Sequence, residues 1–422
     1  MIVSKCLIKV VYSDLFKILL MGIGSMNNKI IAFDFLRALA IIMIIPAHLS
    51  NFLFSIYSKL GLYAFDPYFA NMGLGLFIFI SGYLLYYNNH SINSLQSLLS
   101  FYKKRLLRIY PLYWAALVAY IVVFSVFAQK LNTGFVFPHA DSVFGYFNIL
   151  IHILGLQIFL APAYASPMLT LYFIGLIIAF YTLYPFIIMF SKDARYFLLN
   201  SFIIFIVFLL LSRTFSIIDP RFFMFFSVFV FGILTCKESL FDKFEIEIMK
   251  KPFIQIILAV LPVIFVLIIV LESRTLLFLD PKVYFTINSV GSGTIGSSMI
   301  ISMLNSWANS LNLNYSTLQF ILDTLLLNIF IIIFCIFEYR FAMKFINDKF
   351  SSTLSSIFTY IATSSYCVYL FHRPFFALWN SGTNFIHNYI LHDIVIIFIA
   401  LPSLFFVSYN IQILESNLRK YF

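Results

Sequence analysis

The sequence predicts an all-α protein, a polytopic transmembrane helical bundle with about 10 spans plus one re-entrant or interfacial helix. Hydrophobic residues make up 62% of the 422 positions, and charged residues only 10%. Long apolar runs recur along the whole chain, and a helix needs about 20 apolar residues to cross a bilayer. Lys and Arg fall in short clusters between these runs. A soluble globular domain is excluded, because it could not bury so much apolar surface.

The chain divides into three parts. Residues 1–25 form a weakly amphipathic N-terminal extension that lacks the small-residue cleavage signature of a secretory signal. We expect this extension to carry little function, or to lie at the membrane interface. Residues 26–413 form the membrane domain, and residues 414–422 form a cytoplasmic tail.

Hydropathy defines the spans of the membrane domain. They are expected near residues 31–56, 72–87, 109–128, 169–190, 197–212, 221–236, 253–271, 322–337, 354–378 and 391–413. A further apolar stretch, 147–160, is short and contains His152, Gly155 and Gln157. Its length alone does not decide whether it crosses the membrane.

The basic clusters set the orientation, since cytoplasmic loops carry an excess of Lys and Arg. The clusters are Lys103, Lys104, Arg105 and Arg108; Lys192 and Arg195; Lys237, Lys243, Lys250 and Lys251; Arg340, Lys344 and Lys349; and Arg419 and Lys420. All of them can be cytoplasmic together only if the stretch 147–160 does not cross. We therefore expect a re-entrant or surface-lying helix on the outer side, with both termini in the cytoplasm of a cell-membrane protein. The alternative is that this stretch crosses and that the loop with Lys192 and Arg195 is an exception.

Charge and cysteine content exclude other classes. The net charge of +10 does not indicate a nucleic-acid partner, because the basic residues never line a soluble face. The four cysteines show no paired spacing for a disulfide framework or a zinc site, so no metal is expected. The long outer loop 272–320 is rich in Asn, Ser and Gly. Two interpretations of it stay open, a cover over a substrate groove or a flexible tether.

The stretch "FDFLRALAIIMIIPAHLSNF", residues 33–52, carries charged and titratable side chains through an apolar span. Arg37 and His48 are eleven positions apart, which places them on one helix face about 16 Å apart. Asp34 lies one turn before Arg37, where the two can pair. Intramembrane titratable groups are functional by default, and Pro46 frees backbone acceptors beside the imidazole. The alternatives are an interfacial anchor for Asp34 and Arg37, and a histidine satisfied by a neighbouring helix.

Two further stretches lie near this helix. "GLGLFIFISGYLL", residues 73–85, contains Gly73, Gly75, Ser81 and Gly82, and such small residues let a neighbouring helix approach closely. We expect this span to hold a neighbour close to the first helix. "FYKKRLLRIYPLYW", residues 101–114, places its basic cluster at the cytoplasmic entrance to a span. That cluster is either a simple orientation signal or a site for a phosphate-rich ligand, on which Arg105 and Arg108 converge.

The fourth stretch, "SSYCVYLFHRPFF" at residues 364–376, carries Tyr366, Tyr369, His372 and Arg373 to the outer end of a late span. Tyr366, Tyr369 and Arg373 lie at helical spacing along one side. The plain interpretation is an aromatic belt with a basic anchor. The other is a set of functional side chains that face the bundle interior.

Together the four stretches resemble integral-membrane acyltransferase family 3, the group of cell-envelope O-acetylases and related O-acyltransferases. The family typically shows an aspartate, then an arginine and, after ten intervening residues, a histidine, as in "DFLRALAIIMIIPAH" here. It continues with "FFxxSG", here "FIFISG", then "RxxRIxP", here "RLLRIYP", and near the C-terminus "SYxxYLxHxP", here "SYCVYLFHRP". The resemblance covers most of Met26 to Tyr409 and keeps the order of the motifs.

The resemblance implies an O-acyltransferase that moves an acyl group, most often acetyl, from cytoplasmic acyl-CoA. The acceptor would be a hydroxyl of an outward-facing envelope glycan or lipid-linked sugar. His48 would be the catalytic base, with Arg37 as its electrostatic partner and Asp34 paired to that arginine. Residues that would engage the donor are Arg105, Arg108 and Lys104. Residues that would support the reaction or contact substrate are Ser81, Tyr181, Tyr369, His372 and Arg373. No permanently bound cofactor or metal is required.

The chain departs from the family pattern at one place. Many members carry "WxLxxExxFYxxxP", and the aligned stretch here is "YFIGLIIAFYTLYP", residues 172–185. Tyr172 takes the tryptophan position and Ile177 the glutamate position, while Tyr181 and Pro185 are kept. The resemblance alone therefore leaves the acceptor class open. The rival function from the residues themselves is a transporter or flippase for a glycan or anion, with His48 in a proton relay, and a third is a non-catalytic scaffold.

Overall fold

The computed structural model of the chain describes residues 31–46, 48–49, 66–127, 143–189, 193–240, 306, 310, 315–343, 352–383 and 385–421. Every regular element in these ranges is a helix, which confirms the all-α class for the part of the chain described. The N-terminal extension 1–25, the predicted span 253–271 and nearly all of the loop 272–320 lie outside these residues.

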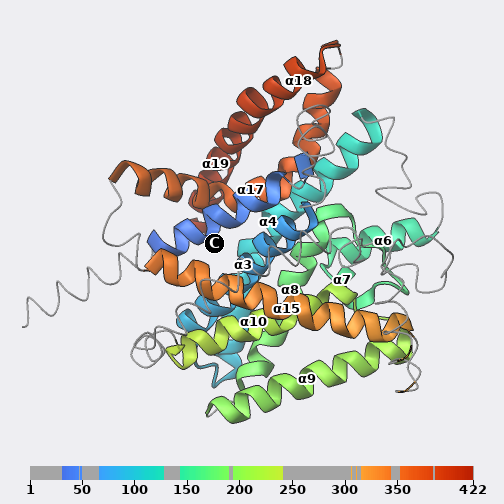
Figure 1. Ribbon diagram of the computed structural model, residues 1–422, viewed down its shortest axis with the longest axis vertical. Helices are drawn as coiled ribbons and strands as arrows, with labels where there is room; N and C mark the ends of the chain where they lie inside the picture. Colours follow the sequence, from blue (N-terminus) through green and yellow to red (C-terminus); the bar gives the residue numbers. More distant parts are fainter. Residues whose placement is uncertain are drawn as a thin grey trace, which may run out of the picture.

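The first helix is described at residues 31–46 and 48–49. The helices that follow are α3 (Asp66–Asn88), α4 (Leu95–Val122), α6 (Val143–Ile153), α7 (Gln157–Leu160), α8 (Tyr172–Met189), α9 (Ala194–Phe215), α10 (Pro220–Lys237), α15 (Tyr315–Phe341), α17 (Ser352–Gly382), α18 (Tyr389–Val395) and α19 (Leu401–Leu418) (Figure 1). Short turns of other helix types extend or join them: η2 (Val123–Phe127), η3 (Leu169–Leu171), η5 (Ile396–Ala400) and η6 (Arg419–Tyr421).

Within the described ranges, 7 helices are long and apolar enough to cross a membrane. They lie at Phe69–Asn88, Leu95–Ser125, Leu169–Met189, Ala194–Phe215, Pro220–Lys237, Leu354–Gly382 and Tyr389–Leu418. Each matches a predicted span. The predicted spans 31–56 and 322–337 are helical where they are described. The structure therefore supports a multi-pass membrane protein and leaves the predicted number of spans as a prediction.

The position of α4 corrects one boundary. The predicted span began at residue 109, whereas α4 begins at Leu95. Ser94 caps the helix, because its hydroxyl accepts from the Ser97 amide while the Ser97 hydroxyl accepts from the Ser94 amide, both at 3.1 Å. Hydropathy recognises only the apolar part of such a helix. The basic cluster therefore lies on the same rigid helix as the membrane span.

The stretch 147–160 folds as two short helices, α6 and α7. They are separated at Gly155, whose φ of +71° is in the left-handed region that favours glycine. Tyr113 of α4 donates to the carbonyl of His152 at 2.7 Å, and Tyr110 donates to the carbonyl of Leu154 at 2.7 Å. One continuous crossing helix is therefore absent from this stretch. The side of the membrane on which it lies stays a prediction.

His152 stabilises the α6 and α7 region as a neutral imidazole. The ring is fully enclosed, with Nδ1 2.7 Å from the carbonyl oxygen of Asn148. Its Nε2 accepts a hydrogen bond of 2.9 Å from the Met168 amide, so the proton is on Nδ1. Burial lowers the pKa of His152 to about 4. This histidine is therefore a structural group and carries no charge at neutral pH.

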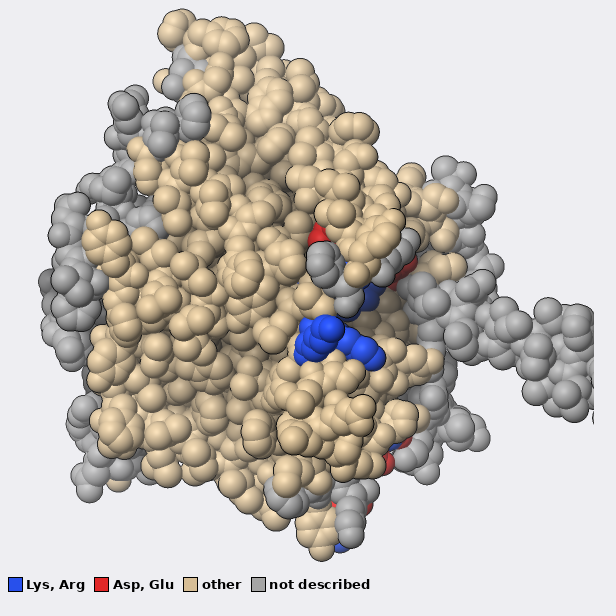
Figure 2. All heavy atoms as spheres, turned by 180° about the vertical axis from the view of Figure 1, so that it is seen from behind, with Lys and Arg blue, Asp and Glu red and all other residues tan. Residues whose placement is uncertain are grey.

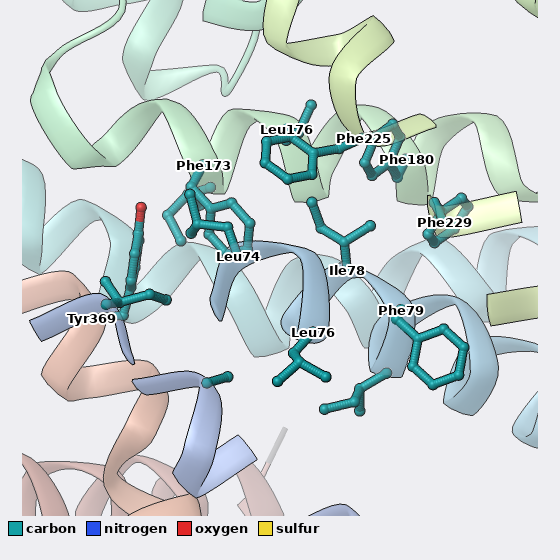
Figure 3. Packing of buried hydrophobic residues seen from close by; sticks show 14 of the residues in the cluster. Leu74, Leu76, Ile78, Phe79, Phe173, Leu176, Phe180, Phe225, Phe229 and Tyr369 are labelled. Carbon is teal, nitrogen blue, oxygen red and sulfur yellow. The ribbon is translucent and has the colours of Figure 1, made fainter. Parts of the chain in front are cut away.

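The core lies where α3 packs between the first helix, α10 and α15. A Cβ atom at Gly73 would lie 2.6 Å from the carbonyl oxygen of Ala40, so a glycine is needed for the first helix to approach. Gly82 of α3 and Gly232 of α10 allow the same close approach between those two helices. The predicted role of the small residues in the span 73–85 is confirmed. Figure 3 shows the buried aromatic and aliphatic side chains that fill the space between α3, α8 and α10.

The first helix lies alongside α17, although the two are far apart in the sequence (Figure 1). Thr359 of α17 hydrogen-bonds Asp34, and His372 of α17 stacks on His48. The contacts occur in the same order along both helices, so the two helices run in the same direction. This pairing brings Asp34 to Thr359 at one end and His48 to His372 and Arg373 at the other.

Candidate active site

The basic end of this helix pair is formed by Asp34, Arg37, Arg105 and Arg108. Nη1 of Arg37 lies 3.1 Å from Oδ1 of Asp34, which confirms the predicted ion pair. Thr359 donates to the other carboxylate oxygen at 3.2 Å. Asp34 is therefore fully engaged, and it holds the guanidinium of Arg37 in place.

Arg105 and Arg108 extend the basic end from α4. The guanidinium of Arg105 lies 5.5 Å from the ring centre of Tyr181 and 5.6 Å from that of Phe101, in cation–π contact. Its Nε is enclosed and has no hydrogen-bond partner among the described residues. Arg108 is exposed and lies within electrostatic range of both Arg37 and Arg105. Three guanidiniums and one carboxylate leave an excess of positive charge, which suits an anionic ligand.

The surface of the molecule agrees with a membrane protein. Figure 2 shows Lys and Arg side chains gathered in a compact patch on a face that is otherwise largely uncharged. Lys104 is exposed on α4, beside the two arginines in sequence. A largely uncharged face is what a helical bundle presents to lipid.

The histidine end is formed by His48, His372 and Arg373. The imidazole rings of His48 and His372 stack with centroids 5.1 Å apart and planes inclined by 16°. Nη2 of Arg373 lies 3.2 Å from Nδ1 of His48. Sequence reasoning placed His48 on the face of Arg37 but did not identify its neighbours. The structure brings it to two polar side chains of α17 rather than to an apolar surface.

The ring of His372 is fixed by its own helix. Its Nδ1 lies 2.7 Å from the carbonyl oxygen of Tyr369 and 3.2 Å from that of Val368. The side chain is completely buried, and its Nε2 has no hydrogen-bond partner in the described part of the chain. A buried acceptor without a partner requires an explanation.

Hydroxyl groups surround the histidine end. Tyr369 donates to the backbone carbonyl of Thr170 at 2.7 Å, and Tyr120 hydrogen-bonds the hydroxyl of Thr170 at 2.5 Å. The hydroxyls of Tyr120, Tyr369 and Tyr172 all lie within electrostatic range of Arg373. The predicted placement of Tyr369 beside Arg373 is therefore observed.

An ion pair that sequence reasoning missed lies at the same end. Nη2 of Arg221 lies 2.6 Å from Oδ2 of Asp219. The guanidinium of Arg221 stacks 3.9 Å from the ring centre of Tyr172. Asp219 also caps α10, where its carboxylate accepts from the Arg221 amide at 2.9 Å. The available signal was the sequence "DPR" at the start of an apolar run, a capping residue followed by proline. It places a carboxylate within electrostatic range of Tyr172, although Ile177 takes the family's glutamate position.

Of the remaining predicted residues, one belongs to the site and one is joined to neither end. Tyr181 belongs to the basic end through its contact with Arg105. Ser81 is partly buried on α3, and no hydrogen bond of the described residues joins it to either end. Within the described ranges no three His, Cys, Asp or Glu side chains come together as a metal site. The roles assigned to these residues stay predictions.

Comparison with known proteins gave one match. The model of a family described as an acyltransferase domain, Acyl_transf_3, matches residues 30–412. Neither a search of curated proteins nor a search of solved structures returned a match. The matched range includes both ends of the site.

Proposed function

The chain belongs to acyltransferase family 3 and is a membrane acyltransferase, and from this premise we propose its reaction. It transfers an acyl group, with acetyl as the expected group, from acyl-CoA to a hydroxyl of an envelope glycan or lipid-linked sugar. The chain lies in the cell membrane with both termini in the cytoplasm, and the donor enters from that side. The acceptor is presented on the outer side.

The observation that carries this proposal is the alignment of two polar ends along one pair of helices. Arg37 and His48 lie about 16 Å apart along the first helix, from its rise per residue. α17 follows the same path from Thr359 to Arg373. A donor that reaches both ends needs an anionic head for the basic end, a reactive group for the histidine end and a long, narrow arm between them. Acyl-CoA has this form.

The basic end supports binding of the donor's phosphates. Guanidinium groups form bidentate hydrogen bonds to phosphate oxygens. The enclosed Nε of Arg105 offers a donor that no described residue uses. Arg37, held by Asp34, supplies a second cation toward the interior of the bundle.

The histidine end supports the transfer itself. A neutral imidazole can accept a proton from a hydroxyl that attacks the thioester carbonyl. The guanidinium of Arg373 can stabilise the negative charge that develops on the carbonyl oxygen. Tyr172, Arg221 and Tyr369 are planar or charged groups beside this end and are suited to hold a polar acceptor.

Mass spectrometry of envelope glycans tests this function. Cells that express the chain should carry glycans heavier by one acyl group than cells that lack it. Cells that express the Arg105→Ala variant should show less of the product at equal protein level. Identical glycans in the presence and absence of the chain would contradict the proposal.

A further inference from the structure

We propose that His372, and not His48, accepts the proton of the attacking hydroxyl. This inference rests on the function proposed above and deepens it. It assigns the two stacked imidazoles different tasks, although the family resemblance gives the task of base to the histidine of the first helix.

The contact with Arg373 fixes the proton of His48. A guanidinium has only N–H donors, so Nδ1 of His48 must be the acceptor of the 3.2 Å hydrogen bond. A neutral imidazole that accepts at Nδ1 carries its proton on Nε2. His48 in this arrangement is therefore an acceptor at Nδ1 and a donor at Nε2. It could accept a further proton only if Arg373 moved away.

The contacts of His372 fix the opposite tautomer. Its Nδ1 faces the carbonyl oxygens of Tyr369 and Val368, which are acceptors only. The proton must therefore be on Nδ1, which leaves the lone pair on Nε2. This is the form that a general base requires.

The surroundings of Nε2 indicate a use for that lone pair. The atom is enclosed and has no partner among the described residues. An enclosed acceptor without a partner is destabilising unless a ligand supplies the missing hydrogen bond. Nε of Arg373, the next residue of α17, is likewise enclosed and without a described partner. An unused acceptor beside an unused donor matches a reaction in which a hydroxyl gives up a proton and a carbonyl oxygen gains negative charge.

The step balances without any other reactant. The acceptor hydroxyl gives its proton to Nε2 of His372 as its oxygen forms a bond to the thioester carbonyl carbon. The carbonyl oxygen carries the negative charge and faces Arg373. When the carbon–sulfur bond breaks, its electron pair goes to sulfur, and His372 returns the proton to give the free thiol. The products are an ester and coenzyme A, and His372 is neutral again.

A substitution separates this role from a structural one. In His372→Asn the side-chain amide takes the place of Nδ1–H and keeps the hydrogen bond to the Tyr369 carbonyl, but nothing replaces Nε2. We expect kcat for acetyl transfer in membrane vesicles to fall by about 100-fold or more, as for loss of a general base. The KM for acetyl-CoA should stay within about threefold, because the basic end is unchanged. The matched control is His387→Asn, at an exposed histidine of the same part of the chain.

The outcomes are distinguishable. If the wild-type chain transfers acetyl and His372→Asn does so within about tenfold of its rate, this inference is wrong and the proposed function stands. If the wild-type chain transfers nothing, the proposed function fails and takes this inference with it.

A second measurement does not depend on activity. Solid-state NMR of nitrogen-labelled histidines in the wild-type protein should show His372 protonated at Nδ1 and His48 protonated at Nε2. The His372→Asn and His48→Asn spectra assign the two signals. A proton on Nε2 of His372 in the neutral resting protein would overturn the inference.

Discussion

Arg373 hydrogen-bonds His48 across a separation of 325 residues, with 3.2 Å between Nη2 and Nδ1. The contact joins the first helix to α17 and completes the histidine end. Because the two helices lie at opposite ends of the sequence, the site exists only when the bundle is assembled. This relationship makes Arg373 the most informative single residue to change.

Replacement of Arg373 should reduce catalysis more than donor binding. Arg373→Ala removes the cation that faces the developing oxyanion, and loss of one such donor costs about 10²–10³ in kcat. Arg373→Lys keeps the charge but not the planar fork, so its kcat should lie between those of Ala and wild type. Steady-state kinetics of acetyl transfer in vesicles measure both. An equal kcat for the Ala and Lys variants would contradict a role for charge.

Replacement of Arg105 should weaken donor binding instead. A charge-assisted hydrogen bond contributes about 1.5–3 kcal/mol, so Arg105→Ala should raise the KM for acyl-CoA by about 10-fold to 100-fold. The control is Arg195→Ala, at an exposed arginine of α9. It removes one positive charge without touching the basic end, and its KM should equal that of the wild type. A larger effect for Arg195 than for Arg105 would show that general charge, and not this site, attracts the donor.

Gly73 should be required for the first helix to pack. A Cβ at this position would lie 2.6 Å from the Ala40 carbonyl oxygen, whereas one at Gly382 would meet nothing within 4 Å. Gly73→Ala should lower stability by about 1–3 kcal/mol, the usual cost of overpacking. Gly382→Ala is the matched control and should melt at the wild-type temperature. Melting curves in detergent compare the two, and equal melting temperatures would contradict the close approach.

His152 should make stability depend on pH. Its pKa is lowered to about 4 in the folded protein, against about 6.5 in an unfolded chain. Between these values the unfolded chain binds the extra proton and the folded chain does not. The stabilisation by neutral His152 is complete above pH 6.5 and is lost as the pH falls toward 4, by an amount on the order of 3 kcal/mol.

The His152→Gln variant isolates this effect. It cannot gain the charge, so its melting temperature should fall less than that of the wild type between pH 7 and pH 5. Other acidic groups titrate in both proteins and cancel in the comparison. An equal fall in melting temperature for the two proteins between pH 7 and pH 5 would rule out the buried neutral imidazole.

Relationships that are local in the sequence could be predicted. Asp34 and Arg37 are one helical turn apart, and helix geometry alone brings them together. The same geometry predicts that Arg37 and His48 share one helix face. The small residues around Gly73 predicted a close helix contact, because small side chains let helix backbones approach each other.

Relationships between distant helices could not be predicted from periodicity. Nothing in the first helix indicates that His372 stacks on His48, because the choice of neighbouring helix depends on packing over the whole bundle. The stacking of Arg221 on Tyr172 could not be predicted for the same reason, whereas its ion pair with Asp219 is local and was overlooked. The start of α4 was placed too late, because charged residues end a hydropathy signal but do not end a helix.

The central claim is that a donor whose anionic head lies at the basic end transfers its acyl group to an acceptor at the histidine end. It is tested most directly in sealed vesicles with acetyl-CoA on the cytoplasmic face alone and glycan acceptor on the other. The account predicts acetylated glycan with the wild-type protein and a loss of about 100-fold or more with His48→Ala at equal insertion, because this variant removes the hydrogen-bond partner that holds Arg373 in place. Undiminished transfer by His48→Ala would contradict it.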